Sequence, residues 1–353
     1  MLVMSVVGAR PQFVKLAPID RAFRCAGITH LILHTGQHYD PLLSDAFFAD
    51  LGISTPDYHL NIGSGSHGEQ TGKMLIDIEK ILLSHRPDWV LVYGDTNSTL
   101  AAALAAVKLD IPVAHLEAGL RSFNRDMPEE HNRVLTDHAA DLLLAPSETA
   151  ITQLSREGLA DRTVLVGDVM VDVLYAQRDA VQQDPIPVPA AEQEYYLATI
   201  HRPQNTDSLV RLRAILDAFA EFDRPVFLLA HPRLQKIAAA EELMHDRGNL
   251  HWHEPLPYPQ LVRAVMSAKA VVTDSGGLQK EAFLLRTPCI TVRTETEWTE
   301  TVDLGWNMLV EPGEQMLQAV ASLSPENTDA APYGTGDAAQ QVAHALTKLY
   351  ETV

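Results

Sequence analysis

A regular alternation of short apolar runs and helix-like segments most constrains the fold of this chain. In the first half the runs are LVMSVV, HLILH, WVLVY, PVAHL, LLLAP and TVLVG. Because they are continuously apolar and not alternating, they predict strands that are buried on both faces, as in a parallel sheet. Segments with helical periodicity lie between them, for example 70–83 and 96–108. This order predicts a doubly wound α/β domain.

The alternation stops once and then begins again. Residues 184–194, DPIPVPAAEQE, contain three prolines without periodicity, which predicts an interdomain linker. Beyond them the apolar runs are YYLATI, PVFLLA, NLHWH, AVVTD, PCITV and NMLV. A chain of 353 residues is long enough for two domains. We therefore predict an α/β protein with two Rossmann-like, doubly wound domains that face a cleft.

The net charge and the N-terminal segment limit the kinds of binding partner that we expect. A net charge of −19 repels nucleic acid and anionic membranes, so we expect neither as a partner. The apolar N-terminus, MLVMSVVG, is too short to cross a bilayer and has no basic segment, so it is interpreted as the first strand.

Cysteine and histidine spacing gives no indication of a metal site. Cys25 and Cys289 lie far apart in apolar surroundings, which predicts two reduced, buried thiols in a cytoplasmic protein. His251 and His253 share a face of a short strand, but no third ligand accompanies them. We therefore expect neither a metal nor a cofactor.

Ligands of open α/β sheets bind outside the carboxyl ends of the strands, and with two such domains the cleft is the expected site. The first strand is followed by Gly8, Arg10 and Pro11. Pro11 suits the start of a helix, on which Lys15 lies one turn further along. Arg10 at a helix N-terminus predicts an anion site.

Two carboxylates end neighbouring strands of the first half. Asp95 follows WVLVY, and Glu117 follows PVAHL. Parallel pairing would bring them close together, where like charges raise at least one pKa and suit general acid–base chemistry. As an alternative, Asp95 could serve only as the N-cap of the next helix.

A third group of charges follows Pro128, at an expected helix start where the dipole stabilises carboxylates. Glu129 and Arg133 lie one helical turn apart, so they are predicted to face the same ligand. Glu130 and Arg125 are interpreted as solvated charges.

In the second half, polar residues follow three apolar runs. They are His201, His231, Ser275, Gly276 and Gly277. Ser-Gly-Gly at a helix N-terminus offers free backbone N–H groups to a phosphate. Glu281, further along that helix, could accept hydrogen bonds from ribose hydroxyls.

Two glycine-rich patterns are not assigned to nucleotide binding. GSGSHG (63–68) follows no long strand, and GEQTGK lacks both the first glycine and the final Ser/Thr of a phosphate-binding loop. Residues 61–69 are interpreted as a mobile loop.

Seven motifs, in order from about residue 3 to 310, together resemble the non-hydrolysing UDP-N-acetylglucosamine 2-epimerases. They are GARPQFVKLAPI, TGQHYD, GDTNSTLAAALAA, HLEAGLRS, MPEEHNRVLTDH, IHRPQNTD and DSGGLQKEA. The resemblance implies the two-domain glycosyltransferase-B fold, whose last helix returns to the first domain. We therefore predict one domain of residues 1–183 plus 337–353 and a UDP-binding domain of residues 184–336.

The resemblance also implies a reaction. UDP-N-acetylglucosamine and UDP-N-acetylmannosamine would interconvert at C2 through UDP elimination to a 2-acetamidoglucal and re-addition. The enzyme would be a cytoplasmic homodimer that feeds surface polysaccharide synthesis and needs no cofactor.

Residue roles are implied by the same motifs. The acid–base carboxylates would be Asp95, Glu117 and Glu129, with His201 and Lys15 also counted as catalytic. The substrate- and UDP-binding residues would be Arg10, Arg133, His231, Ser275, Gly276, Gly277 and Glu281, and the uracil would meet backbone near 256–261.

Some positions depart from the family pattern. Pro203 and Gln204 replace charged residues of the bacterial members, and Trp298 stands where many members carry Arg. Gln70 matches one of the glutamines that bind a second UDP-sugar in some members, but the others are missing from TGQHYDPLLSDAFF, so we expect no activation by substrate. The alternatives are epimerisation of a UDP-2,3-diacetamido uronic acid, a hydrolysing epimerase, and a glycosyltransferase of the same fold.

Overall fold

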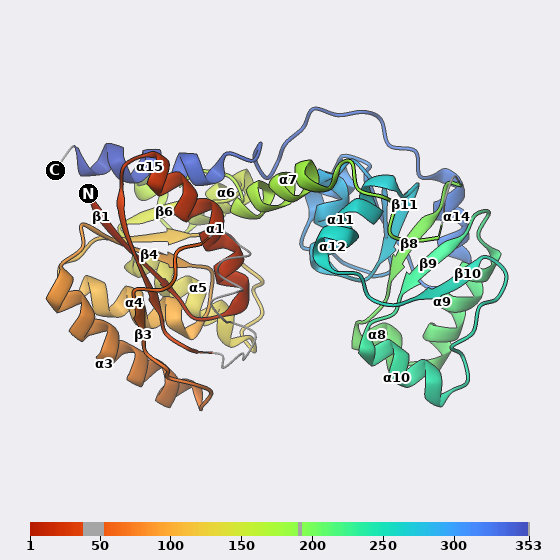
Figure 1. The fold of residues 1–353 in the computed structure, drawn as a ribbon, viewed down its shortest axis with the longest axis horizontal. Coiled ribbons are helices and arrows are strands. Elements are labelled where there is room, and N and C mark those ends of the chain that lie inside the picture. The colour runs from red at the N-terminus through yellow and green to blue at the C-terminus, as the bar shows by residue number, and fades with distance from the viewer. Residues whose placement is uncertain (38–52, 190–192, 352–353) are drawn as a thin grey trace. The chain divides into compact units, whose positions relative to one another are not determined.

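The structure, a computed structural model, describes residues 1–37, 53–189 and 193–351, which form two compact units (Figure 1). Unit 1 comprises Met1–Val173 and Ala331–Val353, and unit 2 comprises Leu174–Ala330. The predicted domain boundaries at 183/184 and 336/337 remain predictions. Part of the TGQHYD motif (38–40), part of the linker (190–192) and the last two residues lie outside the described residues.

Unit 1 contains a seven-stranded parallel sheet in the order β3-β2-β1-β4-β5-β6-β7. The strands are β1 (Leu2–Val7), β2 (Thr29–His34), β3 (Tyr58–His59), β4 (Trp89–Tyr93), β5 (Val113–Leu116), β6 (Leu142–Ala145) and β7 (Thr163–Leu165). All six apolar runs predicted in this half are strands. The prediction missed β3, because two residues are too few to produce a periodic pattern.

Helices cover both faces of this sheet (Figure 1). They are α1 (Arg10–Cys25), α3 (His67–His85), α4 (Asn97–Val107), α5 (Pro128–Ala139), α6 (Glu148–Arg156), the 3₁₀ helix η1 (Ala160–Arg162), α7 (Val169–Val181, which continues into unit 2) and α15 (Ala338–Tyr350). On one face Val3 and Val7 pack against α1 and α15; on the other Met4 and Val6 pack against α3 and α4. This two-sided burial explains why the strands are apolar throughout.

Unit 2 contains a six-stranded parallel sheet in the order β10-β9-β8-β11-β12-β13. The strands are β8 (Tyr196–Thr199), β9 (Val226–Leu229), β10 (Leu250–His253), β11 (Ala270–Thr273), β12 (Cys289–Thr291) and β13 (Asn307–Leu309). The helices are α8 (Pro203–Thr206), α9 (Leu209–Glu221), α10 (Pro232–Ala240), α11 (Tyr258–Ser267), α12 (Gly276–Leu284), α13 (Thr299–Asp303) and α14 (Glu314–Ser322). One face packs against α9 and α14, and the other against α11 and α12.

The strand order reverses at equivalent places in the two sheets. In unit 1 the chain leaves β1 in one direction and resumes on its other side with β4; in unit 2, β8 and β11 are related in the same way. Ligands of doubly wound sheets bind at this switch point, outside the carboxyl ends of the strands. The topology therefore directs attention to the residues after β1, β4 and β5 and to those after β8 and β11.

Two local predictions are wrong. Helix α3 begins at His67 with Ser66 as its N-cap, so residues 67–69 belong to a helix and not to a loop. Cys25 is exposed because it is the last residue of α1, whereas Cys289 is buried as predicted.

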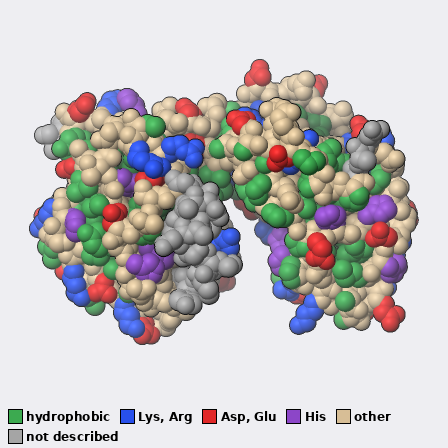
Figure 2. Space-filling model, viewed as in Figure 1, with side chains coloured by type: hydrophobic (Ala, Val, Ile, Leu, Met, Phe, Trp, Pro, Cys, Tyr) green, Lys and Arg blue, Asp and Glu red, His purple; other side chains and the backbone are tan. Residues whose placement is uncertain are grey.

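The surface side chains, the helix lengths and the grouping of metal-binding side chains give three further observations. Figure 2 shows acidic, basic and hydrophobic side chains interspersed over the visible face of both units. No helix in the described ranges is both long and apolar enough to cross a membrane. Within those same ranges, no group of three or more His, Cys, Asp or Glu side chains could hold a metal ion.

Candidate active site

The carboxyl ends of β4 and β5 carry two of the predicted catalytic carboxylates, Asp95 and Glu117. The two strands are paired neighbours, with Tyr93 opposite Leu116. Gly94 and Glu117 have positive φ angles of 60° and 71°. A non-glycine residue in this region is uncommon and persists where the surrounding structure holds it, often at functional sites. The backbone thus turns sharply where Glu117 leaves the sheet.

Each of these carboxylates pairs with a cation. Lys15 Nζ lies 2.5 Å from Glu117 Oε2, and Arg133 Nη2 lies 2.5 Å from Asp95 Oδ2. The expected contact between two like charges is therefore replaced by two ion pairs. Burial lowers the pKa of Lys15, but the Glu117 carboxylate outweighs it and the net shift is upward. Lys15 therefore remains a cation beside Glu117.

A pocket of about 270 Å³ opens beside Asp95. Its lining is mainly polar and comprises Gln37, Ser64, Gly65, His67, Gln70, Asp95, Thr96, Asn97, Pro128, Glu129 and Asn132. Glu129 is exposed on α5 and has no hydrogen bond or ion pair within the described part of the chain. Asp95, held by Arg133, and the exposed Glu129 are thus brought to one pocket.

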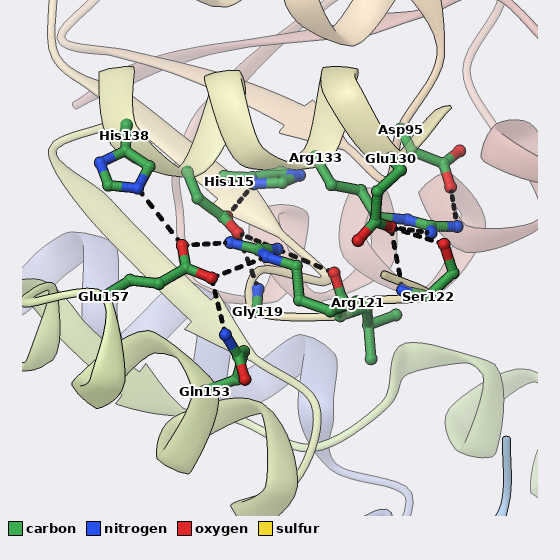
Figure 3. Close-up of polar contacts among 12 residues, drawn as sticks. Asp95, His115, Gly119, Arg121, Ser122, Glu130, Arg133, His138, Gln153 and Glu157 are labelled. Carbon is green, nitrogen blue, oxygen red and sulfur yellow. Dashed lines mark hydrogen bonds and ion pairs between the residues drawn. The ribbon is translucent and has the colours of Figure 1, made fainter. Parts of the chain in front are cut away.

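Glu130 is not the solvated charge that was predicted. It is buried, and its carboxylate accepts hydrogen bonds from the backbone N–H groups of Ser122 and Phe123 and an ion pair from Arg133 (Figure 3). Burial raises the pKa of Glu130, but these donors outweigh it and lower the pKa overall. Glu130 therefore ties the loop after β5 to α5. Arg133 joins this structural carboxylate to Asp95.

Neighbouring polar side chains fix the turns that carry the site. Thr96, and not Asp95, is the N-cap of α4, because its hydroxyl accepts from Thr99 N–H. Gln12 was missed by the sequence analysis. Its Oε1 accepts from the N–H groups of Gly8 and Ala9, while its Nε2 donates to the Tyr93 carbonyl. A polar residue on the buried side of α1 was the available indication of this role.

Arg10 is the first residue of α1 and is exposed, directly after the turn that Gln12 organises. The structure therefore places Arg10, Lys15, Asp95, Glu117, Glu129 and Arg133 in unit 1, at or next to the carboxyl ends of β1, β4 and β5.

Unit 2 has its own pocket, of about 370 Å³, at the carboxyl ends of β8, β9 and β11. It is lined by Thr199, His201, Leu229, His231, Pro255, Leu256, Tyr258, Leu261, Ser275, Gly277, Leu278 and Glu281. The predicted residues His201, His231, Ser275, Gly277 and Glu281 are therefore brought together. An apolar wall with a few polar groups suits a flat ring carrying polar substituents.

The N-terminus of α12 enters this pocket. Ser275 is the N-cap, and its hydroxyl accepts from Leu278 N–H. A side chain at Gly276 would meet Glu297 Oε1 at 2.2 Å, so Glu297 would have to move to admit one. Free N–H groups at the start of this nine-residue helix can bind a phosphate.

Two acidic groups hold the polar side chains of this pocket. Asp274, fully buried and missed by the sequence analysis, accepts from the N–H groups of His201 and Arg202, and its Oδ1 lies 3.2 Å from His201 Nδ1. Glu281 accepts from the Tyr258 hydroxyl at 3.1 Å, and burial raises the pKa of Glu281. His231 caps α10 through its Nδ1. Each group therefore has a defined orientation.

Comparison with known proteins identifies the family of this chain. The family model for UDP-N-acetylglucosamine 2-epimerase matches residues 21–347. The chain belongs to this family. The 2-epimerases are isomerases, so the chain is a member of an enzyme family.

Individual relatives match over their whole length. A UDP-N-acetylglucosamine 2-epimerase homolog of Methanococcus maripaludis is 45% identical over 99% of this chain and 100% of its own. The UDP-2,3-diacetamido-2,3-dideoxy-D-glucuronate 2-epimerase of Pseudomonas aeruginosa is 44% identical over the same shares. The solved UDP-GlcNAc 2-epimerase of Methanocaldococcus jannaschii, 39% identical, superposes with a TM-score of 0.89 over 99% of this chain and 100% of that chain. This agreement confirms the predicted fold class.

Proposed function

We propose that the chain catalyses the reversible C2 epimerisation of UDP-N-acetylglucosamine to UDP-N-acetylmannosamine. A base removes the C2 proton, and the electron pair forms the C1–C2 double bond of a 2-acetamidoglucal. The C1–O bond to UDP breaks, and the diphosphate leaves with the negative charge. UDP then adds back to C1 while a proton returns to the opposite face of C2. No electrons are gained or lost overall, so the reaction needs no redox cofactor.

The observation that carries this proposal is the set of carboxylates in unit 1. Removing a weakly acidic proton and returning one to the other face requires more than one acid–base group. Asp95 and Glu129 line one pocket, and Glu117 ends the adjacent strand next to Lys15. We assign the proton transfers to these carboxylates and a supporting role to Lys15, with Arg133 and Arg10 as substrate-binding cations.

The pocket of unit 2 supports the assignment of the UDP site. The departing diphosphate needs fixed N–H dipoles and cations for its growing charge. Gly276 and Gly277 at the start of α12 supply such N–H groups, whereas the Ser275 N–H donates to the Thr273 hydroxyl. His201, His231 and the Ser275 side chain lie beside them. Glu281 is placed to accept from ribose hydroxyls. These roles accompany the predicted division into domains of residues 1–183 plus 337–353 and 184–336.

The second candidate is C2 epimerisation of a UDP-2,3-diacetamido uronic acid, because the 44%-identical relative carries that name. A uronate brings an additional carboxylate, which favours a nearby cation. Within the described residues, two carboxylates line the pocket of unit 1, and the nearest cations, Arg133 and Lys15, are already paired with Asp95 and Glu117. This charge distribution favours the neutral N-acetylhexosamine.

The test is incubation with each UDP-sugar in D₂O without an acceptor, followed by NMR. We expect deuterium at C2 and the manno product from UDP-N-acetylglucosamine, with slower exchange from the uronate. Faster exchange from the uronate would support the second candidate. Sustained release of UDP would instead identify a hydrolysing enzyme, and exchange with neither sugar would contradict a 2-epimerase.

We also propose that the enzyme is a cytoplasmic homodimer. Ile76 and Leu83 on α3 and Leu135 on α5 are 56%, 48% and 53% exposed, although they are large apolar residues. Where exposed apolar side chains form a contiguous patch, a second copy can cover them. Light scattering should give twice the 38.8 kDa chain mass, and a monomer with full activity would contradict the dimer.

A further inference from the structure

A buried ionic network lies beneath the carboxylate-bearing turns of unit 1 (Figure 3). His115 Nδ1 lies 2.6 Å from Asp137 Oδ1, and both side chains are fully buried. Arg121 Nη1 lies 2.7 Å from Asp137 Oδ2, and Arg121 Nη2 lies 2.8 Å from Glu157. The sequence analysis assigned no role to His115, Asp137 or Glu157.

Each ring nitrogen of His115 has a hydrogen-bond partner. Nδ1 faces the Asp137 carboxylate, and Nε2 lies 2.7 Å from the carbonyl oxygen of Gly94. The ring is therefore held from both of its nitrogens. Burial raises the pKa of Asp137, but His115 and Arg121 outweigh it, and the net shift is downward. The Asp137 carboxylate is thus stabilised by contacts with both His115 and Arg121.

The network joins the two turns that carry the catalytic carboxylates. His115 donates to the carbonyl of Gly94, which directly precedes Asp95. Asp137 Oδ2 accepts from the N–H of Gly119, two residues after Glu117, at 3.0 Å. Gly94, Glu117 and Gly119 have positive φ angles of 60°, 71° and 82°. Glycine adopts such angles without strain, whereas Glu117 between them does so only where the surrounding structure holds it. His115 and Asp137 contact the backbone on the two sides of this strained residue.

We infer that His115 and Asp137 are positioning residues for the proton transfers at C2. His115 is fully buried and does not contact the substrate, so it acts through the turns. It fixes the Gly94–Asp95 peptide relative to Glu117, and Asp137 fixes the Glu117–Gly119 turn from below. This inference rests on the proposed function, because it concerns the approach of those carboxylates to the sugar.

Two substitutions at His115 separate its two contacts. In His115→Asn the amide nitrogen lies near the position of Nδ1. It can therefore keep the hydrogen bond to Asp137, but the hydrogen bond to the Gly94 carbonyl is lost. In His115→Gln the amide nitrogen reaches the position of Nε2, so it can keep the hydrogen bond to the Gly94 carbonyl. A displacement of about 1 Å of a catalytic group can lower the rate about 100-fold. We expect C2 exchange to fall about 100-fold in His115→Asn and at most about tenfold in His115→Gln.

The kinetic isotope effect distinguishes a misplaced catalytic carboxylate from a smaller fraction of folded protein. We expect the kinetic isotope effect with C2-deuterated substrate to rise in His115→Asn, because proton removal by a misplaced carboxylate limits the rate more strongly. A smaller folded fraction would lower the rate and leave the isotope effect unchanged. UDP affinity should match the wild type, because the proposed UDP pocket lies in unit 2.

The outcomes can be told apart. Absence of exchange by the wild type would overturn the proposed function itself. Exchange by the wild type, with His115→Asn within twofold of it or with an unchanged isotope effect, would overturn only the positioning role. If His115→Asn does not fold, Asp137→Asn takes its place: a raised isotope effect supports the inference, and an unchanged one contradicts it.

Discussion

At the residue scale, Glu129 and Glu130 are adjacent in sequence but have opposite surroundings. Glu129 is exposed in the pocket of unit 1, whereas Glu130 is buried among donors from the loop after β5. Adjacent positions on a helix point in directions about 100° apart, so one can face the ligand while the other faces the protein. This is why we propose a chemical role for Glu129, while the contacts of Glu130 are structural.

This difference predicts opposite effects of the same substitution. Glu129→Gln should lower C2 exchange by about 10²–10⁴-fold, as expected for loss of an acid–base group, and should change the free energy of unfolding by less than about 0.5 kcal/mol. Glu130→Gln should lower the free energy of unfolding by about 1–3 kcal/mol, because buried donors lose a charged acceptor. Urea unfolding and exchange assays on both variants check this, and equal destabilisation by the two would contradict it.

The stabilising effect of Glu130 should depend on pH. Its pKa is lowered from 4.5 in the folded state, so the folded protein favours the ionised form. The stabilisation is therefore fully present above pH 4.5 and is lost as pH falls through the lower folded pKa. The difference in unfolding free energy between wild type and Glu130→Gln should shrink below pH 4.5. A difference that stays constant down to pH 3 would count against the assigned hydrogen bonds.

At the element scale, the strands were predictable because each is a short apolar run between polar turns. Six of seven strands in unit 1 and all six in unit 2 match predicted runs. Side-chain roles that depend on distant partners were not predictable. The donors to Glu130 belong to a loop whose conformation depends on the tertiary structure. His115 lies within an apolar strand, and its sequence neighbours give no indication that it pairs with Asp137. The predicted solvation of Glu130 failed for this reason.

The docking of the last helix, α15, onto α7 gives a testable prediction at the element scale. Asp172 of α7 accepts from the N–H groups of Ala338 and Ala339 at 3.1 and 3.0 Å, and so caps α15 from another element. Burial raises the pKa of Asp172 to about 6, above its ordinary 3.8. The folded state then binds more protons than the open state between these values, so docking of α15 weakens as pH rises from about 4 to about 6.

Asp172→Asn should remove that pH dependence, because the amide oxygen still accepts but does not titrate. The measurement is hydrogen-exchange protection of the α15 amides, corrected for intrinsic exchange, between pH 4 and 7. We expect protection to fall with pH in the wild type and to stay level in the variant. Parallel curves would contradict the assigned role of Asp172.

At the scale of the whole molecule, the two units share one strand order and carry different chemistry at their switch points. Unit 1 presents carboxylates and their paired cations, while unit 2 presents a helix N-terminus and an apolar pocket. This division predicts that UDP binding and proton transfer can be impaired separately.

UDP should raise the melting temperature of the wild type, since a ligand that binds only the folded protein stabilises it by about 2.7 kcal/mol at 100 times its Kd. Ser275→Ala should reduce this shift. Ser147→Ala is a matched control, because Ser147 caps α6 through Ala150 N–H in unit 1, as Ser275 caps α12 in unit 2. Each variant should lose about 1 kcal/mol from its cap. An equal UDP shift in both variants would contradict the assigned phosphate site.

The central claim is that carboxylates of unit 1 exchange the C2 proton of a UDP-sugar, and Glu117 is placed for this at a left-handed strand end beside Lys15. The most direct measurement is deuterium incorporation at C2 of UDP-N-acetylglucosamine in D₂O, by the wild type and by Glu117→Gln. We predict that the wild type incorporates deuterium and forms the manno epimer, and that the variant does so at least about 100-fold more slowly. Equal incorporation by both proteins, or none by the wild type, would contradict the claim.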